Sequence, residues 1–195
     1  ERHQYSNVWP DEPAAARSDA SALVFAVGTR PDAARSAGLV AGHHTFCIAP
    51  IRMSTDTGPL SLRVQYWAVG RDCCDDGPGS FTCGDAQNPS ARAGLVLHSR
   101  TNFYDVLIPK DIAFYEEAAR MAAARYGLAA ASKPLFLHWA ADIEHANWRL
   151  VTNVSLFQLK VCLLAFPLFA LLSLGPPGVA SATRAALGKM RRTFA

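Results

Sequence analysis

The stretch from Leu150 to Gly175 limits what this chain can fold into more than any other, because its composition suits a solvent other than water. It contains a run from Val161 to Leu174 without a charged residue. About 20 mainly apolar residues in a helix cross a hydrocarbon core of roughly 30 Å. The segment 149–175 therefore predicts one transmembrane helix.

The alternative is a helix buried in a protein core, because the charge-free run alone is shorter than a span and contains Pro167. Membrane helices tolerate proline where neighbouring groups accommodate the freed carbonyl. Trp148 and Arg149 stand where anchors at a membrane interface are expected. These features favour the transmembrane helix.

The charges on the two sides of this segment differ in sign. Residues 1–148 hold all 16 acidic residues and 13 of the 19 basic ones, a net charge of −3, whereas the remainder holds six basic residues and no acidic one. Basic residues flank membrane helices on the side that is not translocated. The large N-terminal region is therefore expected on the translocated side. The modest overall charge gives no indication of nucleic-acid binding.

Local patterns divide the chain into four parts and predict an α+β fold. Apolar runs ended by Gly or Pro predict strands near 23–27, 44–49 and 60–69, and the run at 95–97, after a polar loop, predicts another. Apolar residues at helical spacing predict a helix over 111–126, closed by Gly127. The expected fold is a small antiparallel sheet with one packed helix, stapled by disulfides, plus one C-terminal transmembrane helix. The parts are an extended arm (1–22), the translocated α+β domain (23–148), the transmembrane helix (149–175) and a basic tail (176–195).

Four of the five cysteines, Cys47, Cys73, Cys74 and Cys83, lie in the region expected on the translocated side. An even set of cysteines in an oxidising compartment predicts two disulfides. Adjacent cysteines seldom pair with each other. Two pairings remain open: Cys47–Cys73 with Cys74–Cys83, or Cys47–Cys74 with Cys73–Cys83.

Two other states of these cysteines are weighed against disulfides. A zinc site would combine the thiolates with His43 or His44, but no cysteine pair has the spacing typical of such sites. Buried reduced thiols are the third state. Four nearby aspartates (Asp72, Asp75, Asp76 and Asp85) match no calcium-binding loop, so the sequence predicts no metal.

Polar residues at the expected membrane boundary are candidates for contacts with partners. Arg149, Asn153 and Lys160 form one stripe at helical spacing, and polar groups at membrane depth usually face protein. This stripe is expected to face membrane partners. The candidates for binding a pigment, chlorophyll or carotenoid, at the interface with those partners are His138, His145, Asn153 and Gln158.

Motifs of the common catalytic centres are absent from the sequence. It contains no G-x-S-x-G, no G-x-G-x-x-G and no Walker A motif. The chain is therefore expected to be no enzyme and to have no intrinsic cofactor. A thiol-redox enzyme that uses the adjacent Cys73 and Cys74 is the alternative.

The string Tyr66-Trp67-Ala68-Val69-Gly70-Arg71-Asp72-Cys73-Cys74, with Phe81-Thr82-Cys83-Gly84-Asp85-Ala86 and Ala91-Arg92-Ala93-Gly94-Leu95-Val96, resembles a family of uncharacterised membrane-anchored proteins of dinoflagellate algae. The likeness extends over roughly residues 43–175. It implies a membrane-anchored domain with clustered cysteines, and no catalytic residues.

Together these observations predict a non-catalytic accessory subunit of a large membrane complex. The algal resemblance favours a photosystem–antenna supercomplex, with the domain in the thylakoid lumen of the plastid and the tail in the stroma. Its expected partners are membrane subunits and the lipid bilayer. A respiratory accessory subunit and a free-standing receptor module are the remaining alternatives.

Overall fold

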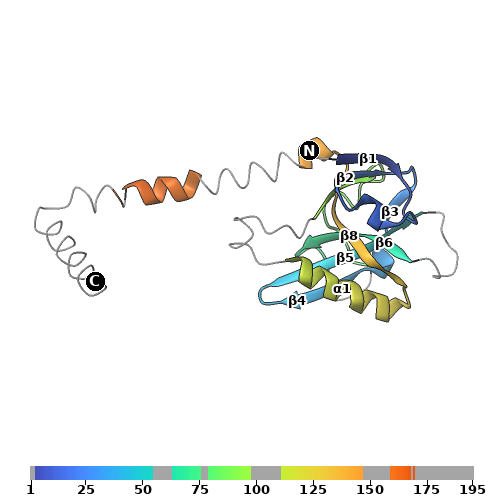
Figure 1. Ribbon diagram of the computed structural model, residues 1–195. Helices are drawn as coiled ribbons and strands as arrows, with labels where there is room; N and C mark the ends of the chain where they lie inside the picture. Colours follow the sequence, from blue (N-terminus) through green and yellow to red (C-terminus); the bar gives the residue numbers. More distant parts are fainter. Residues whose placement is uncertain are drawn as a thin grey trace, which may run out of the picture. The chain divides into compact units, whose positions relative to one another are not determined.

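A computed structural model describes residues 3–54, 63–75, 79–97, 111–146, 159–167 and 169. The chain divides into two units, residues 1–147 and 148–195. Within the described part, the first unit contains eight strands, one α-helix and two short 3-10 helices (Figure 1). The strands are β1 (His3–Val8), β2 (Ala20–Phe25), β3 (Thr29–Pro31), β4 (Ala37–Ala41), β5 (His44–Met53), β6 (Val64–Arg71), β7 (Ala93–Val96) and β8 (Ala130–Ala140). The helices are α1 (Asp111–Tyr126), η1 (Ala14–Arg17) and η2 (Ala33–Arg35).

The strands form one mixed sheet in the order β1-β2-β7-β8-β6-β5-β3, with β4 also pairing with β5. β1 runs parallel to β2, and β6 runs parallel to β8, while the other pairs are antiparallel. The expectation of a small antiparallel sheet was therefore wrong. The prediction failed because strand pairing is set by contacts distant in sequence, whereas the patterns of alternation and turns report only local structure.

The central strands carry apolar side chains on both faces, as strands covered on both sides must. On β6, Tyr66 and Ala68 face one core cluster, while Trp67 and Val69 face the other. The alternation along this strand breaks at Gln65, where the pairing with β8 shifts register. The Gln65 side chain instead accepts a hydrogen bond from the Ala14 N–H, at 3.1 Å, and so holds η1 against the sheet.

One face of the sheet, here called the helix face, is covered by α1, which lies along β4 and β5 (Figure 1). The Phe46 ring stacks on Phe114 and meets Tyr115 edge to face, with ring centroids 4.6 and 5.4 Å apart. The helix follows the predicted bounds, and Gly127 after it has the positive φ of 63° expected at this C-terminal position. The core of this face comprises Phe46, Ile48, Trp67, Val69, Tyr115, Ala118, Ala122 and Phe136, among others.

The opposite face, here called the cystine face, is covered by η1 and by the chain between β6 and β7, which forms no helix or strand in its described residues. Phe25 is central, with ring centroids 5.3 Å from Tyr66 and 5.7 Å from Trp139. The buried residues of this face include Leu23, Phe25, Cys47, Tyr66, Phe81, Cys83, Ala91, Leu137 and Trp139.

The prediction of a C-terminal transmembrane helix is contradicted. No helix among the described residues is both long enough and apolar enough to cross a membrane. Of the predicted span 149–175, residues 159–167 and 169 are described as helical, and the rest lies outside the described residues. The charge-free run has 14 residues, which at 1.5 Å each give about 21 Å, less than a hydrocarbon core.

The predictions that depended on this helix are corrected with it. These predictions were that the chain is a single-pass membrane protein, that it is a photosystem subunit in photosynthesis, and that it lies in the plastid thylakoid membrane. Each of them rested on the apolar stretch as a span, and the helices described do not provide one.

Candidate functional site: two adjoining disulfides

The neighbouring strands β5 and β6 provide the base of a sulfur-rich site. Cys47 on β5 and Gly70 on β6 are direct partners in the antiparallel ladder. Directly opposed residues present their side chains on the same face of a sheet. Cys47 is fully buried, at 0% exposure, on the cystine face. Because Gly70 has no side chain, the space beside Cys47 is open to another part of the chain.

A sharp turn at Asp72 brings Cys73 and Cys74 to this space. Asp72 has a positive φ of 57°, which few residues other than Gly, Asn and Asp adopt. Its backbone N–H donates to the Thr45 carbonyl, and its carboxylate accepts from the Thr45 N–H, both at 2.8 Å. The second carboxylate oxygen lies 2.7 Å from His44 Nδ1. The Thr45 hydrogen bond, followed by the contact with His44, lowers the pKa of the Asp72 carboxyl.

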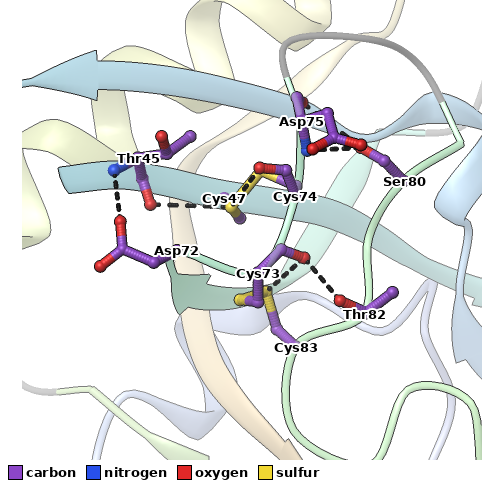
Figure 2. Close-up of a disulfide and its surroundings, with 9 residues drawn as sticks. All are labelled: Thr45, Cys47, Asp72, Cys73, Cys74, Asp75, Ser80, Thr82 and Cys83. Atoms are coloured by element: carbon purple, nitrogen blue, oxygen red, sulfur yellow. Dashed lines mark hydrogen bonds between the residues drawn. A yellow bond between two sulfur atoms is a disulfide. The ribbon is translucent and has the colours of Figure 1, made fainter.

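The structure contains disulfides between Cys47 and Cys74 and between Cys73 and Cys83 (Figure 2). This is the second of the two pairings that the sequence left open. The Cα atoms are 5.7 Å apart in the first pair and 5.1 Å in the second, within the usual range for disulfides. Cys162, the fifth cysteine, is exposed and is not in a disulfide.

Backbone contacts fix the chain that returns from Cys74 to Cys83. The Cys73 carbonyl accepts hydrogen bonds from the N–H and the hydroxyl of Thr82, at 2.9 and 3.0 Å. The Ser80 hydroxyl accepts from the Asp75 N–H at 2.8 Å (Figure 2). Each disulfide therefore lies beside a hydrogen bond that holds the same segment, and the crosslinks reinforce a conformation that the backbone already has.

Two glycines allow the close approach of this segment to the sheet. A Cβ atom on Gly70 would lie 2.6 Å from Cys73 Sγ and 2.6 Å from Cys83 Cβ. A Cβ atom on Gly84, whose φ is +58°, would lie 2.1 Å from the Trp139 carbonyl oxygen. The sequence analysis missed both residues as part of the site. The signal was their placement next to cysteines, Gly70 three residues before Cys73 and Gly84 directly after Cys83.

The two disulfides adjoin each other. The Sγ atoms of Cys47, Cys73 and Cys83 all lie within 4.8 Å of one another. Such a group of thiolates suits a soft metal, but here each sulfur is bonded to another sulfur and has no thiolate charge to offer. The chemistry that this arrangement favours is exchange between sulfurs.

A second polar group lies where β6 ends and α1 begins. Arg71 forms an ion pair with Asp111, the first residue of α1. Burial lowers the pKa of the nearby His138 imidazole, so this side chain is neutral at pH 7. Burial also raises the pKa of the Tyr115 hydroxyl to about 12. Among the described residues, this group offers no nucleophile paired with a base, and its ion pair joins the strand to the helix.

The other predicted site residues are not brought together in the described part of the chain. The acidic residues near the cysteines have separate contacts: the Asp72 carboxylate contacts Thr45 and His44, and the Asp85 carboxylate accepts from the Ala141 N–H at 2.8 Å. Of the proposed partner-facing stripe, only Lys160 is described, and it is exposed on the helical segment 159–167. Arg149, Asn153 and Gln158 lie outside the described residues, as does Asp76.

The two histidines proposed for pigment binding lie in ordered backbone. His138 is in β8, paired with Val69 of β6 and Leu95 of β7. The backbone N–H of His145 donates to the Asp142 carboxylate at 3.1 Å, in the first turn that follows β8. Pigment binding by either histidine stays a prediction.

Comparison with known proteins gives no relative: no protein-family model, no curated protein and no solved structure matches the chain.

Proposed function

We propose that the domain formed by residues 3–146 is a non-catalytic accessory domain, which binds protein partners within a larger assembly in an oxidising compartment. Its four cysteines are all in disulfides, which persist in such compartments. Both crosslinks lie on the cystine face. There they hold the chain between β6 and β7, which has no helix or strand in its described residues. In the oxidised chain, the two crosslinks stabilise this face of the fold.

The observation that carries the proposal is a pair of exposed apolar side chains at one end of the sheet. Trp9 and Val27 are 47% and 77% exposed. Each follows the end of one of two parallel strands, β1 and β2, which the hydrogen bond from the Ala26 N–H to the Val8 carbonyl (2.9 Å) joins at this end. Exposed tryptophan is enriched among the residues that contribute most to protein–protein affinity.

Two arginines in the first 35 residues form ion pairs within the chain. Arg17 pairs with Glu12 at 3.0 Å, and Arg35 pairs with Asp32. The Arg17 guanidinium also lies 4.6 Å from the centre of the Tyr5 ring. Side chains engaged in this way order the surface that borders Trp9, and an ordered surface loses less entropy when a partner binds.

Substitution of Trp9 tests the proposal. The full chain, with an affinity tag, would be expressed in its native cells, crosslinked mildly and sized by gel filtration. We expect the wild-type chain in a particle larger than its own 21.0 kDa, and Trp9→Ser mostly as free chain. Met121→Ser is the matched control, because Met121 on α1 is exposed to a similar degree, 44%. A wild-type chain that elutes alone at 21.0 kDa would contradict the proposal.

A further inference from the structure

The four paired cysteines differ in their access to solvent. Cys47 and Cys83 are buried, at 0% and 2% exposure, while Cys73 and Cys74 are only partly buried. Each disulfide therefore joins one partly buried cysteine to one fully buried cysteine. A reductant from solvent has two points of entry, Cys73 and Cys74. Attack at either one releases a sulfur that lies in the core.

We propose that these cysteines form a thiol–disulfide exchange site for a dithiol reductant. One two-electron reduction converts the disulfides Cys47–Cys74 and Cys73–Cys83 into a single buried disulfide, Cys47–Cys83. The adjacent Cys73 and Cys74 become a pair of free thiols at the surface. This exchange goes beyond the proposed docking function and does not depend on it.

The route through Cys74 runs in three displacements. A thiolate of the dithiol attacks Cys74 Sγ, which breaks the Cys47–Cys74 bond and leaves the electron pair on Cys47. Cys47 lies within 4.8 Å of Cys83 Sγ and attacks it, which forms Cys47–Cys83 and expels Cys73 as a thiolate. The second thiol of the reductant then attacks the reductant's own sulfur in the mixed disulfide, which forms the disulfide of the oxidised dithiol and expels Cys74 as a thiolate. The dithiol is oxidised to a disulfide, and Cys73 and Cys74 take up two protons.

The route through Cys73 reaches the same product. Attack at Cys73 Sγ expels Cys83, which lies within 4.8 Å of Cys47 Sγ. Cys83 attacks Cys47 and expels Cys74 as a thiolate, and the second thiol of the reductant closes on the reductant's own sulfur and expels Cys73. In both routes the intermediate thiolate is buried and the final leaving group is partly exposed, so each exchange moves the negative charge toward water. A thiolate is better stabilised where water or polar groups surround it.

The geometry at Gly70 favours the new disulfide. The position of a Cβ on Gly70 lies 2.6 Å from Cys83 Cβ, and Cys47 stands directly opposite Gly70 in the ladder. Opposed Cβ positions in a sheet are about 4.5–5.5 Å apart, and a disulfide requires about 3.5–4.5 Å between Cβ atoms. Cys47 and Cys83 therefore both adjoin Gly70, and their Sγ atoms lie within 4.8 Å of each other. Cys73 and Cys74 are neighbours in sequence and seldom bridge each other, so they remain thiols.

The product has a defined ligand class. Two thiols on adjacent, partly exposed residues chelate thiophilic species such as trivalent arsenicals, which bind both sulfurs at once. The oxidised chain has no such pair among its described residues, because Cys162 is the only cysteine outside the disulfides.

Mapping of free thiols tests the proposal. The full chain with Cys162→Ser would receive one equivalent of dithiothreitol, and free thiols would be blocked with N-ethylmaleimide. A protease that cuts before aspartate separates Cys73 and Cys74 from Cys83, because Asp75 and Asp76 lie between them. We expect label on Cys73 and Cys74, a Cys47–Cys83 crosslinked peptide, and binding of one phenylarsine oxide per reduced chain. Label on Cys73 with Cys83, on Cys47 with Cys74, or on all four at once would overturn the proposal.

Two double variants provide an independent readout. Both variants also carry Cys162→Ser, so that only the four paired positions are counted. In Cys73→Ser/Cys74→Ser, oxidative refolding is expected to form Cys47–Cys83 and leave no free thiol. The matched control Cys47→Ser/Cys83→Ser is expected to keep two free thiols. A folded Cys73→Ser/Cys74→Ser chain that still titrates two thiols would refute the exchange. If this variant does not fold, the mapping of the native cysteines decides the question by itself.

Discussion

The two faces of the sheet are covered in different ways. A regular helix covers the helix face, and its stability comes from apolar contacts such as those of Tyr115 with Phe46 and Phe136. The cystine face is covered by η1 and by a segment tied down with two disulfides. A helix satisfies its own backbone hydrogen bonds and can present an apolar stripe, whereas an irregular segment has fewer such contacts to offer. Covalent links are therefore most useful where regular structure is missing.

The largest expected effect is on the helix face. Tyr115→Ala removes a fully buried ring from the contact between α1 and the sheet, so we expect unfolding to become easier by about 3–5 kcal/mol. Denaturant titration measures the loss. Amide exchange would locate it: α1 should lose protection, while the segment 79–97 keeps it through its disulfides. Equal loss in both places would show that the two faces do not differ in this way.

The next effect is on the cystine face. Cys47→Ala/Cys74→Ala removes a crosslink with a sequence separation of 27, so the free energy of unfolding should fall by about 3–4 kcal/mol. Cys73→Ala/Cys83→Ala removes one with a separation of 10, so the fall should be about 2–3 kcal/mol. The melting temperatures of the two variants measure this order. In both, exchange protection of α1 should stay near that of the wild-type chain. A larger loss from the shorter loop would mean that packing around Cys83 outweighs loop entropy.

Alkaline pH acts on one tyrosine from each face. Burial raises the pKa of Tyr66 and of Tyr115 to about 12, above the ordinary value of 10.0. The unfolded chain ionises first, so the stabilisation is complete below pH 10 and is lost as the pH rises toward 12. Each tyrosine contributes about 2–3 kcal/mol to this loss. Unfolding free energies of Tyr66→Phe and Tyr115→Phe between pH 9 and 12 should each show a shallower decline.

At neutral pH, Tyr66→Phe tests the cystine face by itself. The Tyr66 hydroxyl is buried without a hydrogen-bond partner among the described residues, so Tyr66→Phe should be neutral or slightly stabilising. A clear destabilisation by Tyr66→Phe would reveal that its hydroxyl is bonded after all.

The smallest effect concerns the turn at Asp72. Its carboxyl has a lowered pKa, so the stabilisation it gives is present above the ordinary value of 3.8 and is lost as the pH falls through the lower folded value. The Thr45 amide proton, which donates to this carboxylate, should report the titration in its NMR shift. Asp72→Asn keeps a residue that tolerates the positive φ and should abolish the titration. A Thr45 shift that titrates unchanged in this variant would assign it to another group.

The sequence predicted the local parts of this fold and not their long-range pairing. The helix Asp111–Tyr126 was confirmed because its apolar spacing and Gly127 are local signals. The four cysteines were paired to within two alternatives by the rule against adjacent bridging, and the structure contains the second of them. The strand β8 was not predicted, although it carries an apolar run near Trp139. Its parallel partner β6 lies more than 60 residues earlier, beyond any local pattern.

The Cys73–Cys83 disulfide also determines what remains after the backbone is cut. It ties Cys73 to the chain beyond Thr82, so any cut between Cys74 and Cys83 leaves the two fragments covalently joined. Cleavage there would leave the apparent mass of the chain on a non-reducing gel unchanged. A chain cut in that interval would therefore persist as one covalent molecule, and the cut would become visible only after reduction.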